Sequence, residues 1–213
     1  LLVASRRETH LCEIFDAVST SVICSYKNVD TDKTARADIS TYLEDEFSRI
    51  SSEFLARGVA LGIGWPGAEV QEQLVRRSCG VFVFAKTVIQ FIDDGRFSHP
   101  ADRLAAVMAG SPDSTTPLDD LYSTILSVLP YEPLTLRILH AALCSQSKAW
   151  TPEECDLLLG IVPGKARLIL SGLHSILHIP QLFTPWLQSM SSICSQHASF
   201  TDYLGDERRS RKW

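Results

Sequence analysis

The sequence predicts a mainly α protein that begins with a few strands and ends in three helices and a β-hairpin. Three observations predict this fold class. The apolar run Leu1–Ala4 stops abruptly at polar and charged residues, as a buried strand does at the edge of a sheet. Between Asp38 and Leu129, apolar residues recur at steps of three and four. After Pro133, helical patterns are followed by two short apolar stretches.

Two short strands are predicted in the N-terminal segment. Leu1–Ala4 places Arg6 at the carboxyl edge of a sheet, where open α/β sheets bind their ligands. Ser21–Tyr26 is rich in β-branched and aromatic residues and suits a second strand. The polar segment Asn28–Arg36 predicts a linker. Because the chain starts without methionine and nothing upstream completes this sheet, we expect it to be the back part of a longer protein.

Five helical segments are predicted in the middle of the chain. A continuous apolar run suits either a strand or a helix, but the length of the longest run here favours a core helix. The last helix has Pro117 at its first position and acids in its first turn, where the macrodipole favours negative charge. In order, the segments are the stripe from Asp38 to Phe54, the short turns of Val70–Val75, the apolar run Cys79–Ile92, the segment Pro100–Ala109 and the stripe Leu118–Leu129.

The last part of the chain predicts three helices and a β-hairpin, which is the outline of a winged helix. Thr151, with Glu154 three residues later, fits a capping box at the start of the second of these helices. The helices are expected at Leu134–Cys144, from Thr151 to Leu159 and at Pro163–Leu177, and the hairpin strands at His178–Pro180 and Met190–Cys194.

Composition argues against several classes of protein. The 25 acidic and 20 basic residues give a net charge of −5, so the chain as a whole is not built to coat a phosphate backbone. No apolar run approaches the ~20 residues of a membrane-spanning helix. The six cysteines include no C-x-x-C pair, which argues against a zinc ribbon and favours reduced thiols in a cytoplasmic protein.

Five motifs occur in the same order as in one known family. They are Ser5–Glu8, Asp38–Phe47, Cys79–Ala85, Pro117–Tyr122 and His197–Leu204. On these motifs the chain resembles the fungal NACHT-type signalling NTPases of the STAND class, from the end of their nucleotide-binding domain onward. It departs from the family at its second arginine of Ser-Arg-Arg-Glu, where proline is usual. It also contains no G-x-x-x-x-G-K-[ST] phosphate loop and no acidic magnesium strand.

The resemblance implies a more detailed fold and a role. Residues 1–36 would hold residual strands of an α/β nucleotide-binding domain, residues 37–130 a helical lid bundle, and residues 131–213 a winged-helix domain. The lid and winged helix would clamp nucleotide and control assembly in cytoplasmic signal transduction, with no catalysis by this chain. ATP or ADP with Mg²⁺ is expected only in the intact parent, and no cofactor for this chain alone. Expected partners are the upstream nucleotide-binding domain in the same polypeptide and, in the parent, further copies; neither a membrane nor nucleic acid is expected.

Four residues are candidates for nucleotide contact. The resemblance makes Arg6, with Ser5, a sensor of the γ-phosphate, whereas a surface arginine paired with Glu8 is the plain alternative. It places His197 near the β-phosphate of the inactive, diphosphate-bound form, and the alternative is a helix N-cap or a hydrogen-bonded core histidine. Phe82 lies where related proteins pack against adenine, so both stacking and core packing are open.

Two other functions are open. The basic tail Arg208–Lys212 after a winged helix raises nucleic-acid binding, but the third helix combines Lys165 and Arg167 with an apolar surface that suits protein contact. A nucleotide-independent helical adaptor would use that surface alone. His174 and His178 have the i, i+4 spacing of a metal pair, yet the residues between them lack the glutamate of zincins, which favours plain polar positions near a helix end.

Overall fold

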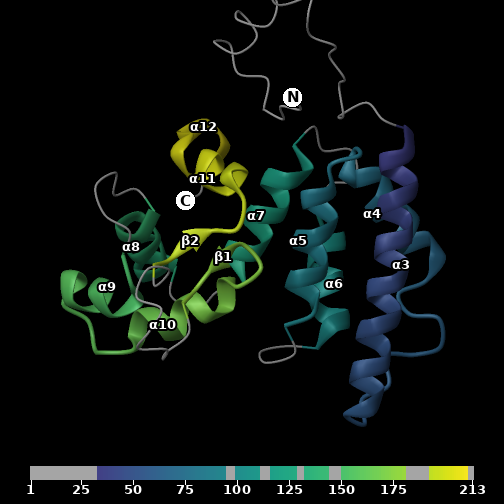
Figure 1. Cartoon of the computed structure of the whole chain (residues 1–213), viewed down its shortest axis with the longest axis horizontal. Coiled ribbons are helices and arrows are strands. Elements are labelled where there is room, and N and C mark those ends of the chain that lie inside the picture. The colour runs from purple at the N-terminus through teal and green to yellow at the C-terminus, as the bar shows by residue number, and fades with distance from the viewer. Residues whose placement is uncertain are drawn as a thin grey trace, which may run out of the picture. The chain divides into compact units, whose positions relative to one another are not determined.

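The computed structural model describes residues 33–94, 99–110, 116–128, 132–143, 150–180 and 192–210. The chain divides into two units, Leu1–Asp32 and Lys33–Trp213, and all described residues lie in the second. These residues form ten α-helices, one 3-10 helix and one two-stranded antiparallel sheet (Figure 1). The prediction of a mainly α protein is therefore confirmed, while the strands predicted at Leu1–Ala4 and Ser21–Tyr26 lie outside the described residues.

The first helix, α3, spans Lys33–Ala56. The prediction that it starts at Asp38, after a linker reaching Arg36, is wrong by more than one turn. No residue that the structure describes ahead of Ile39 is buried, so the first turn carries no apolar stripe from which its start could be predicted. From there the expected stripe is confirmed, and its buried members are Ile39, Leu43, Phe47, Ile50 and Phe54.

Helix α5, Phe82–Ile92, lies at the centre of the helices that follow α3. It packs against α3, α4 (Ala68–Ser78), α6 (Pro100–Met108) and α7 (Pro117–Ser127) (Figure 1). Because it is covered on several sides, its sequence is apolar almost all round, and the expected core helix is confirmed. The helix begins at Phe82 rather than Cys79, since Cys79 and Gly80 both adopt left-handed backbone conformations with φ of 49° and 80°.

The C-terminal half contains α8 (Glu132–Leu143), α9 (Pro152–Leu159) and α10 (Lys165–Leu170). The predicted capping box is confirmed at the start of α9. The backbone N–H of Glu154 donates to Thr151 Oγ1 at 3.2 Å, and the N–H of Thr151 donates to Glu154 Oε2 at 2.9 Å.

The helix expected over Pro163–Leu177 is shorter in the structure. After α10 ends at Leu170, the chain forms a 3-10 helix, Ser171–Leu173, and then a turn. The apolar periodicity continues through this break because the residues on both sides of it are buried in the same core. The apolar periodicity of this segment therefore indicates buried residues and not a continuous helix.

A small sheet joins Leu177–His178 (β1) to Cys194–Ser195 (β2). The strands are antiparallel, with Leu177 opposite Ser195 and His178 opposite Cys194. The expected antiparallel pair is thus present, displaced by a residue from the predicted stretches, and Met190 lies outside the described residues. The chain continues into α11 (Ala198–Gly205) and α12 (Glu207–Ser210).

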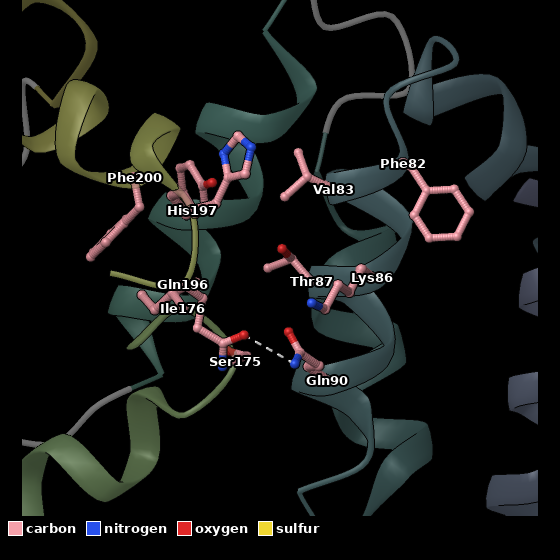
Figure 2. Close-up of a pocket in the computed structure, with 11 residues that line it drawn as sticks. Phe82, Val83, Lys86, Thr87, Gln90, Ser175, Ile176, Gln196, His197 and Phe200 are labelled. Carbon is pink, nitrogen blue, oxygen red and sulfur yellow. Dashed lines mark hydrogen bonds between the residues drawn. The ribbon is translucent and has the colours of Figure 1, made fainter. Parts of the chain in front are cut away.

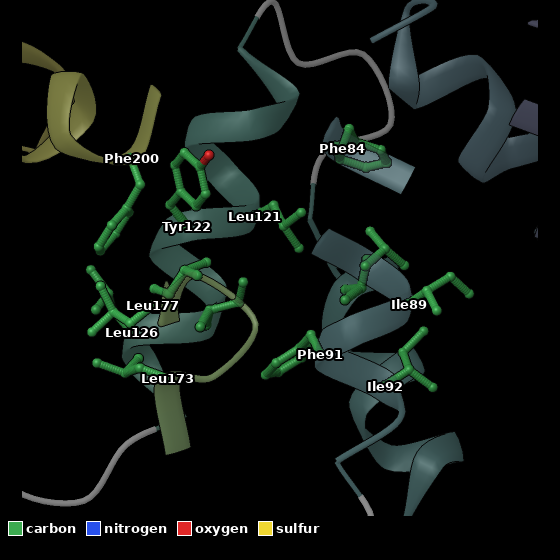
Figure 3. Packing of buried hydrophobic residues seen from close by; sticks show 14 of the residues in the cluster. Phe84, Ile89, Phe91, Ile92, Leu121, Tyr122, Leu126, Leu173, Leu177 and Phe200 are labelled. Atoms are coloured by element: carbon green, nitrogen blue, oxygen red, sulfur yellow. The ribbon is translucent and has the colours of Figure 1, made fainter. Parts of the chain in front are cut away.

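Aromatic packing connects α7 to α11. The ring centroids of Tyr122 and Phe200 are 5.1 Å apart, and those of Tyr122 and Tyr203 are 5.5 Å apart. Figure 3 shows Tyr122 and Phe200 side by side above Leu126 and Leu177. Among the described helices, none combines the length and apolar character that crossing a membrane requires.

Candidate functional site

A cavity of about 180 Å³ lies between α5 and the segments around the small sheet. Figure 2 shows α5 on one side of it and the residues that flank β1 and β2 on the other. Phe82 and His197, two of the four sequence candidates, both line it. The full lining consists of Phe82, Val83, Lys86, Thr87, Gln90, Tyr122, Ser175, Ile176, Gln196, His197 and Phe200.

Helical spacing explains the α5 side of the cavity. Val83, Lys86, Thr87 and Gln90 follow one another at steps of three, one and three, so that they share one face of the helix. Thr87 is buried, whereas Lys86 is exposed. Lys86 is also the only charged residue of α5, which makes it the one sequence feature from which this side of the site could have been inferred.

Two glutamines link the sides of the cavity. Gln90 Nε2 donates to Gln196 Oε1 at 3.2 Å, the bond drawn in Figure 2. The backbone N–H of Gln196 donates to the carbonyl of Ile176 at 2.9 Å, and its side-chain amide donates to the carbonyl of His174. These bonds hold the residue after β2 against both α5 and the turn before β1.

His174 also faces α5. Its Nε2 lies 3.0 Å from the carbonyl oxygen of Gln90, and its Nδ1 lies 3.4 Å from Asp94 Oδ2, close enough for an ion pair but without hydrogen-bond alignment. Arg103 Nη2 lies 3.3 Å from the same oxygen of Asp94, and both of these side chains are buried. His174 is therefore part of the contact between α5 and the turn after α10.

His178 lies on the exposed side of β1. Within the described residues, no group of three or more His, Cys, Asp or Glu side chains lies close enough to hold a metal ion.

His197 is the N-cap of α11. Its Nδ1 accepts a hydrogen bond from the N–H of Ser199 at 3.2 Å and lies 2.6 Å from Ser199 Oγ. Ser199 Oγ is in turn 2.7 Å from the hydroxyl of Tyr122. A neutral imidazole that accepts at Nδ1 carries its proton at Nε2, so the other ring nitrogen is a donor. Capping and ligand contact therefore use different atoms of His197 and are compatible.

The ring of Phe82 is not directed toward His197, unlike the stacking on a ligand that the resemblance implies. Its ring centroid lies 4.9 Å from that of Tyr42 in α3, at an interplanar angle of 49°. Figure 2 shows the ring turned away from His197, on the far side of α5. The ring of Phe82 packs on α3. The part of α5 that faces the cavity with His197 is its first turn, not this ring.

The other sequence candidates, Ser5 and Arg6, lie outside the described residues. Of the basic tail, Arg208 and Arg209 are described and lie in α12. The structure adds Ser175, which sequence reasoning missed. The residue is 1 % exposed and is among those that line the cavity, and its buried hydroxyl has no hydrogen-bond partner among the described residues. No local pattern marks it, because its position depends on a turn and a sheet distant from α5.

No family model matches the chain, and no curated protein or solved structure is significantly similar to it. The resemblance to NACHT-type NTPases therefore stays a proposal. The resemblance rests on the five motifs, and the proposal built on it also uses the geometry of the cavity.

Proposed function

We propose that this chain is the regulatory part of a NACHT-type STAND NTPase that acts in the cytoplasm and has no catalytic activity of its own. One observation carries the proposal: the start of α5 and His197, which are distant in sequence, line the same cavity. The resemblance assigns these two motifs to the same bound nucleotide. Residues 1–36 would end the nucleotide-binding domain, residues 37–130 form the lid, and residues 131–213 form the winged helix.

The proposed mechanism is a clamp that nucleotide exchange releases. In the intact parent, the upstream domain would hold ADP or ATP with Mg²⁺, and Arg6 with Ser5 would read the γ-phosphate at the sheet edge. His197 Nε2 would donate to the β-phosphate of ADP and keep the winged helix closed. Exchange for ATP favours the open form, because a ligand shifts an equilibrium only by its differential affinity for the two states, and open protomers then assemble.

Three polar contacts support a closed arrangement that can reopen. The hydroxyls of Tyr122 and Ser199 are 2.7 Å apart, and those of Ser123 and Tyr203 are 2.8 Å apart. Arg209 in α12 forms an ion pair with a carboxylate of α7. Water can replace each of these contacts when the helices separate, so opening leaves no buried polar group without a partner.

The test uses the parent protein and the substitution His197→Asn. Asparagine keeps an N-cap acceptor but loses the ring nitrogen that would reach the phosphate. We expect ADP to dissociate faster from this variant while its melting temperature without nucleotide is unchanged. His178→Asn, at an exposed position outside the cavity, is the matched control. A parent that binds no nucleotide, or that has no phosphate loop within the ~100–150 residues upstream that one domain occupies, would refute the proposal.

A second candidate function, a nucleotide-independent adaptor, is favoured by one apolar surface. Leu157 and Leu158 in α9, Val162 in the following loop and Leu168 in α10 are all exposed, Leu157 to 82 %. Neighbouring exposed apolar side chains of this kind suit protein contact. A parent whose partner binding is the same with ADP, with ATP and without nucleotide would favour the adaptor over the clamp.

Nucleic-acid binding is supported less well. The guanidinium of Arg167 in α10 is already engaged, with Nη2 2.7 Å from Glu153 Oε1 and Nη1 2.5 Å from the carbonyl oxygen of Pro180. Its neighbour Leu168 is exposed, and an apolar side chain there offers no hydrogen bond to a base edge. A DNA titration at low salt that shows no binding would exclude this function.

A further inference from the structure

The side chain of His174 connects two parts of the molecule that are distant in sequence. It belongs to the turn after α10, and it lies against the backbone of Gln90 in α5 and the carboxylate of Asp94 just beyond that helix. We propose that this His174 contact is pH-sensitive and holds the turn on α5 more tightly when the ring is protonated. The contact is independent of the proposed function, and only its role in opening a clamp rests on that function.

The two ring nitrogens of His174 both face acceptors. Nε2 lies 3.0 Å from the backbone carbonyl oxygen of Gln90, and Nδ1 lies 3.4 Å from Asp94 Oδ2. Because a carbonyl oxygen only accepts hydrogen bonds, Nε2 carries a proton. A neutral imidazole has a single N–H, so Nδ1 of the neutral ring has no proton to offer the carboxylate.

Burial makes the missing proton at Nδ1 unfavourable. This atom is shielded from solvent and has no hydrogen-bond partner among the described residues, although the side chain as a whole is 31 % exposed. Buried polar atoms without partners are uncommon in folded proteins, because such atoms have lost their hydrogen bonds to water. Protonation of Nδ1 supplies a donor, and a small rotation of the ring would then align it with Asp94. The imidazolium thus matches both acceptors, whereas the neutral ring matches one.

Two charges beside the ring act in opposite directions. The carboxylate of Asp94, whose side chain is 1 % exposed, attracts the imidazolium. Arg103 in α6 opposes it, since Arg103 Nη2 lies 3.3 Å from the same carboxylate oxygen. The guanidinium has a second acceptor, because its Nη1 donates to the carbonyl oxygen of Phe91 at 2.6 Å. A carboxylate accepts several hydrogen bonds, so Asp94 is able to serve both cations.

The neighbouring elements contribute bonds that do not titrate near neutral pH. From the β2 side, the neutral side-chain amide of Gln196 donates to the carbonyl oxygen of His174. Near the end of α5, Asp93 is paired with Arg49 of α3 at 2.8 Å. Lys86 lies earlier in α5 and lines the neighbouring cavity. The unfolded chain lacks the His174 contact, so the stability that the charged ring adds is present at low pH and is lost as the pH rises.

The first experiment is urea unfolding of the 213-residue chain between roughly pH 5 and pH 8, where histidine side chains change charge. The variant is His174→Gln, whose amide can still donate to the carbonyl oxygen of Gln90 but does not titrate. At the acidic end of this range, we expect it to change the unfolding equilibrium constant about tenfold more than at the alkaline end, the effect of one charge-assisted hydrogen bond. His178→Gln, at an exposed position on β1, is the matched control and should act equally at both ends.

A second measurement does not depend on unfolding. In nitrogen-15 NMR spectra of the native chain, the ring of His174 should carry its proton on Nε2 at the alkaline end of the range and protons on both nitrogens at the acidic end. The spectrum of His174→Gln serves to assign these signals. Three results would overturn the inference: a proton on Nδ1 at the alkaline end, a neutral ring at the acidic end, or an equal effect of His174→Gln at both ends.

The parent protein separates this inference from the proposed function. If the chain shows the expected His174 behaviour while its parent binds no nucleotide, the pH-sensitive contact stands and the clamp is rejected. If the ring stays neutral at the acidic end while His197→Asn speeds the release of ADP, the clamp stands and the pH-sensitive contact is rejected. If both stand, acid should slow ADP release from the parent, and His174→Gln should remove that effect.

Discussion

Asp119 in α7 and Arg209 in α12 form a two-pronged ion pair across 90 residues of sequence. Arg209 Nη2 lies 2.7 Å from Asp119 Oδ1, and its Nε lies 3.0 Å from Oδ2. Asp119 raises the pKa of the guanidinium through these bonds. The burial of the two partners is unequal, since the Asp119 side chain is 11 % exposed and that of Arg209 is 34 % exposed.

This difference in burial predicts an asymmetry between two substitutions. Arg209→Met leaves a buried carboxylate without its partner and should lower the free energy of unfolding by about 1–3 kcal/mol. Asp119→Asn leaves an arginine that water can reach and should cost less. Urea unfolding of the two single variants and the double variant measures both effects and their coupling. Equal losses, or a larger loss for Asp119→Asn, would show that the pair is effectively solvent-exposed.

Tyr122→Phe tests the hydroxyl contact between α7 and α11. The ring keeps its packing against Phe200, while the bond to Ser199 Oγ is lost. We expect a loss of about 1 kcal/mol in the free energy of unfolding. Because Ser199 also contacts His197 Nδ1, the His197 ring signals should shift in NMR spectra. Tyr203→Phe, which breaks the parallel bond to Ser123, should cost a similar amount and leave those signals in place.

The thiol of Cys155 predicts a loss of stability at high pH. Burial, and then the acidic Asp156 and Glu154 beside it, raise the pKa of this thiol from 9.0 to about 11. Between these values the folded protein keeps a proton that the unfolded chain releases. The stabilisation is thus complete below pH 9 and is lost as the pH rises through about 11, a change of about 3 kcal/mol.

The measurement is the free energy of unfolding between pH 8 and pH 11. Cys155→Ala should flatten its decline across this range, because the titrating group is gone. Cys194→Ala is the control, since that thiol is exposed and reduced. If both variants follow the native curve, other groups cause the alkaline loss.

Asp156→Ala tests the junction between α9 and α10. The buried carboxylate of Asp156 accepts from the N–H of Gly164 at 2.6 Å and from the N–H of Ala166 at 2.8 Å. The substitution leaves both donors without their acceptor, so we expect a loss of about 2 kcal/mol, the upper end for a lost helix cap. Glu153→Ala, on the exposed side of α9, should cost less. Thermal unfolding followed by circular dichroism compares the two.

The elements that local chemistry specifies were predictable from the sequence. The capping box of Thr151 and Glu154 and the proline at the first position of α7 both depend on residues within one turn, and the structure has both. Helix ends that depend on distant residues were not predictable. The start of α10 is held by Asp156 from the preceding helix, and its end lies inside an unbroken apolar pattern.

The cavity residues likewise divide into those that local sequence motifs indicate and those that depend on distant contacts. The resemblance implies that His197 and the start of α5 contact one ligand, which stays a prediction, and both line the cavity. Sequence periodicity could not predict the bond between Gln90 and Gln196, because these residues are 106 positions apart. Nor could it place Ser175 at the cavity, because that residue lies in the turn before β1, distant in sequence from α5. Nor could it show that the ring of Phe82 lies against Tyr42, since an exposed aromatic residue at a helix start can turn to either side.

The bridge between Gln90 and Gln196 has a consequence for how the C-terminal helices would separate from α5. It joins two neutral amides, so added salt leaves it unchanged, whereas the contact of α12 with α7 is an ion pair that salt weakens. The contact of Gln196 with α5 and the contact of α12 with α7 therefore differ in how strongly they depend on salt. Added salt is therefore expected to loosen the contact of α12 with α7 before it affects the contact of Gln196 with α5.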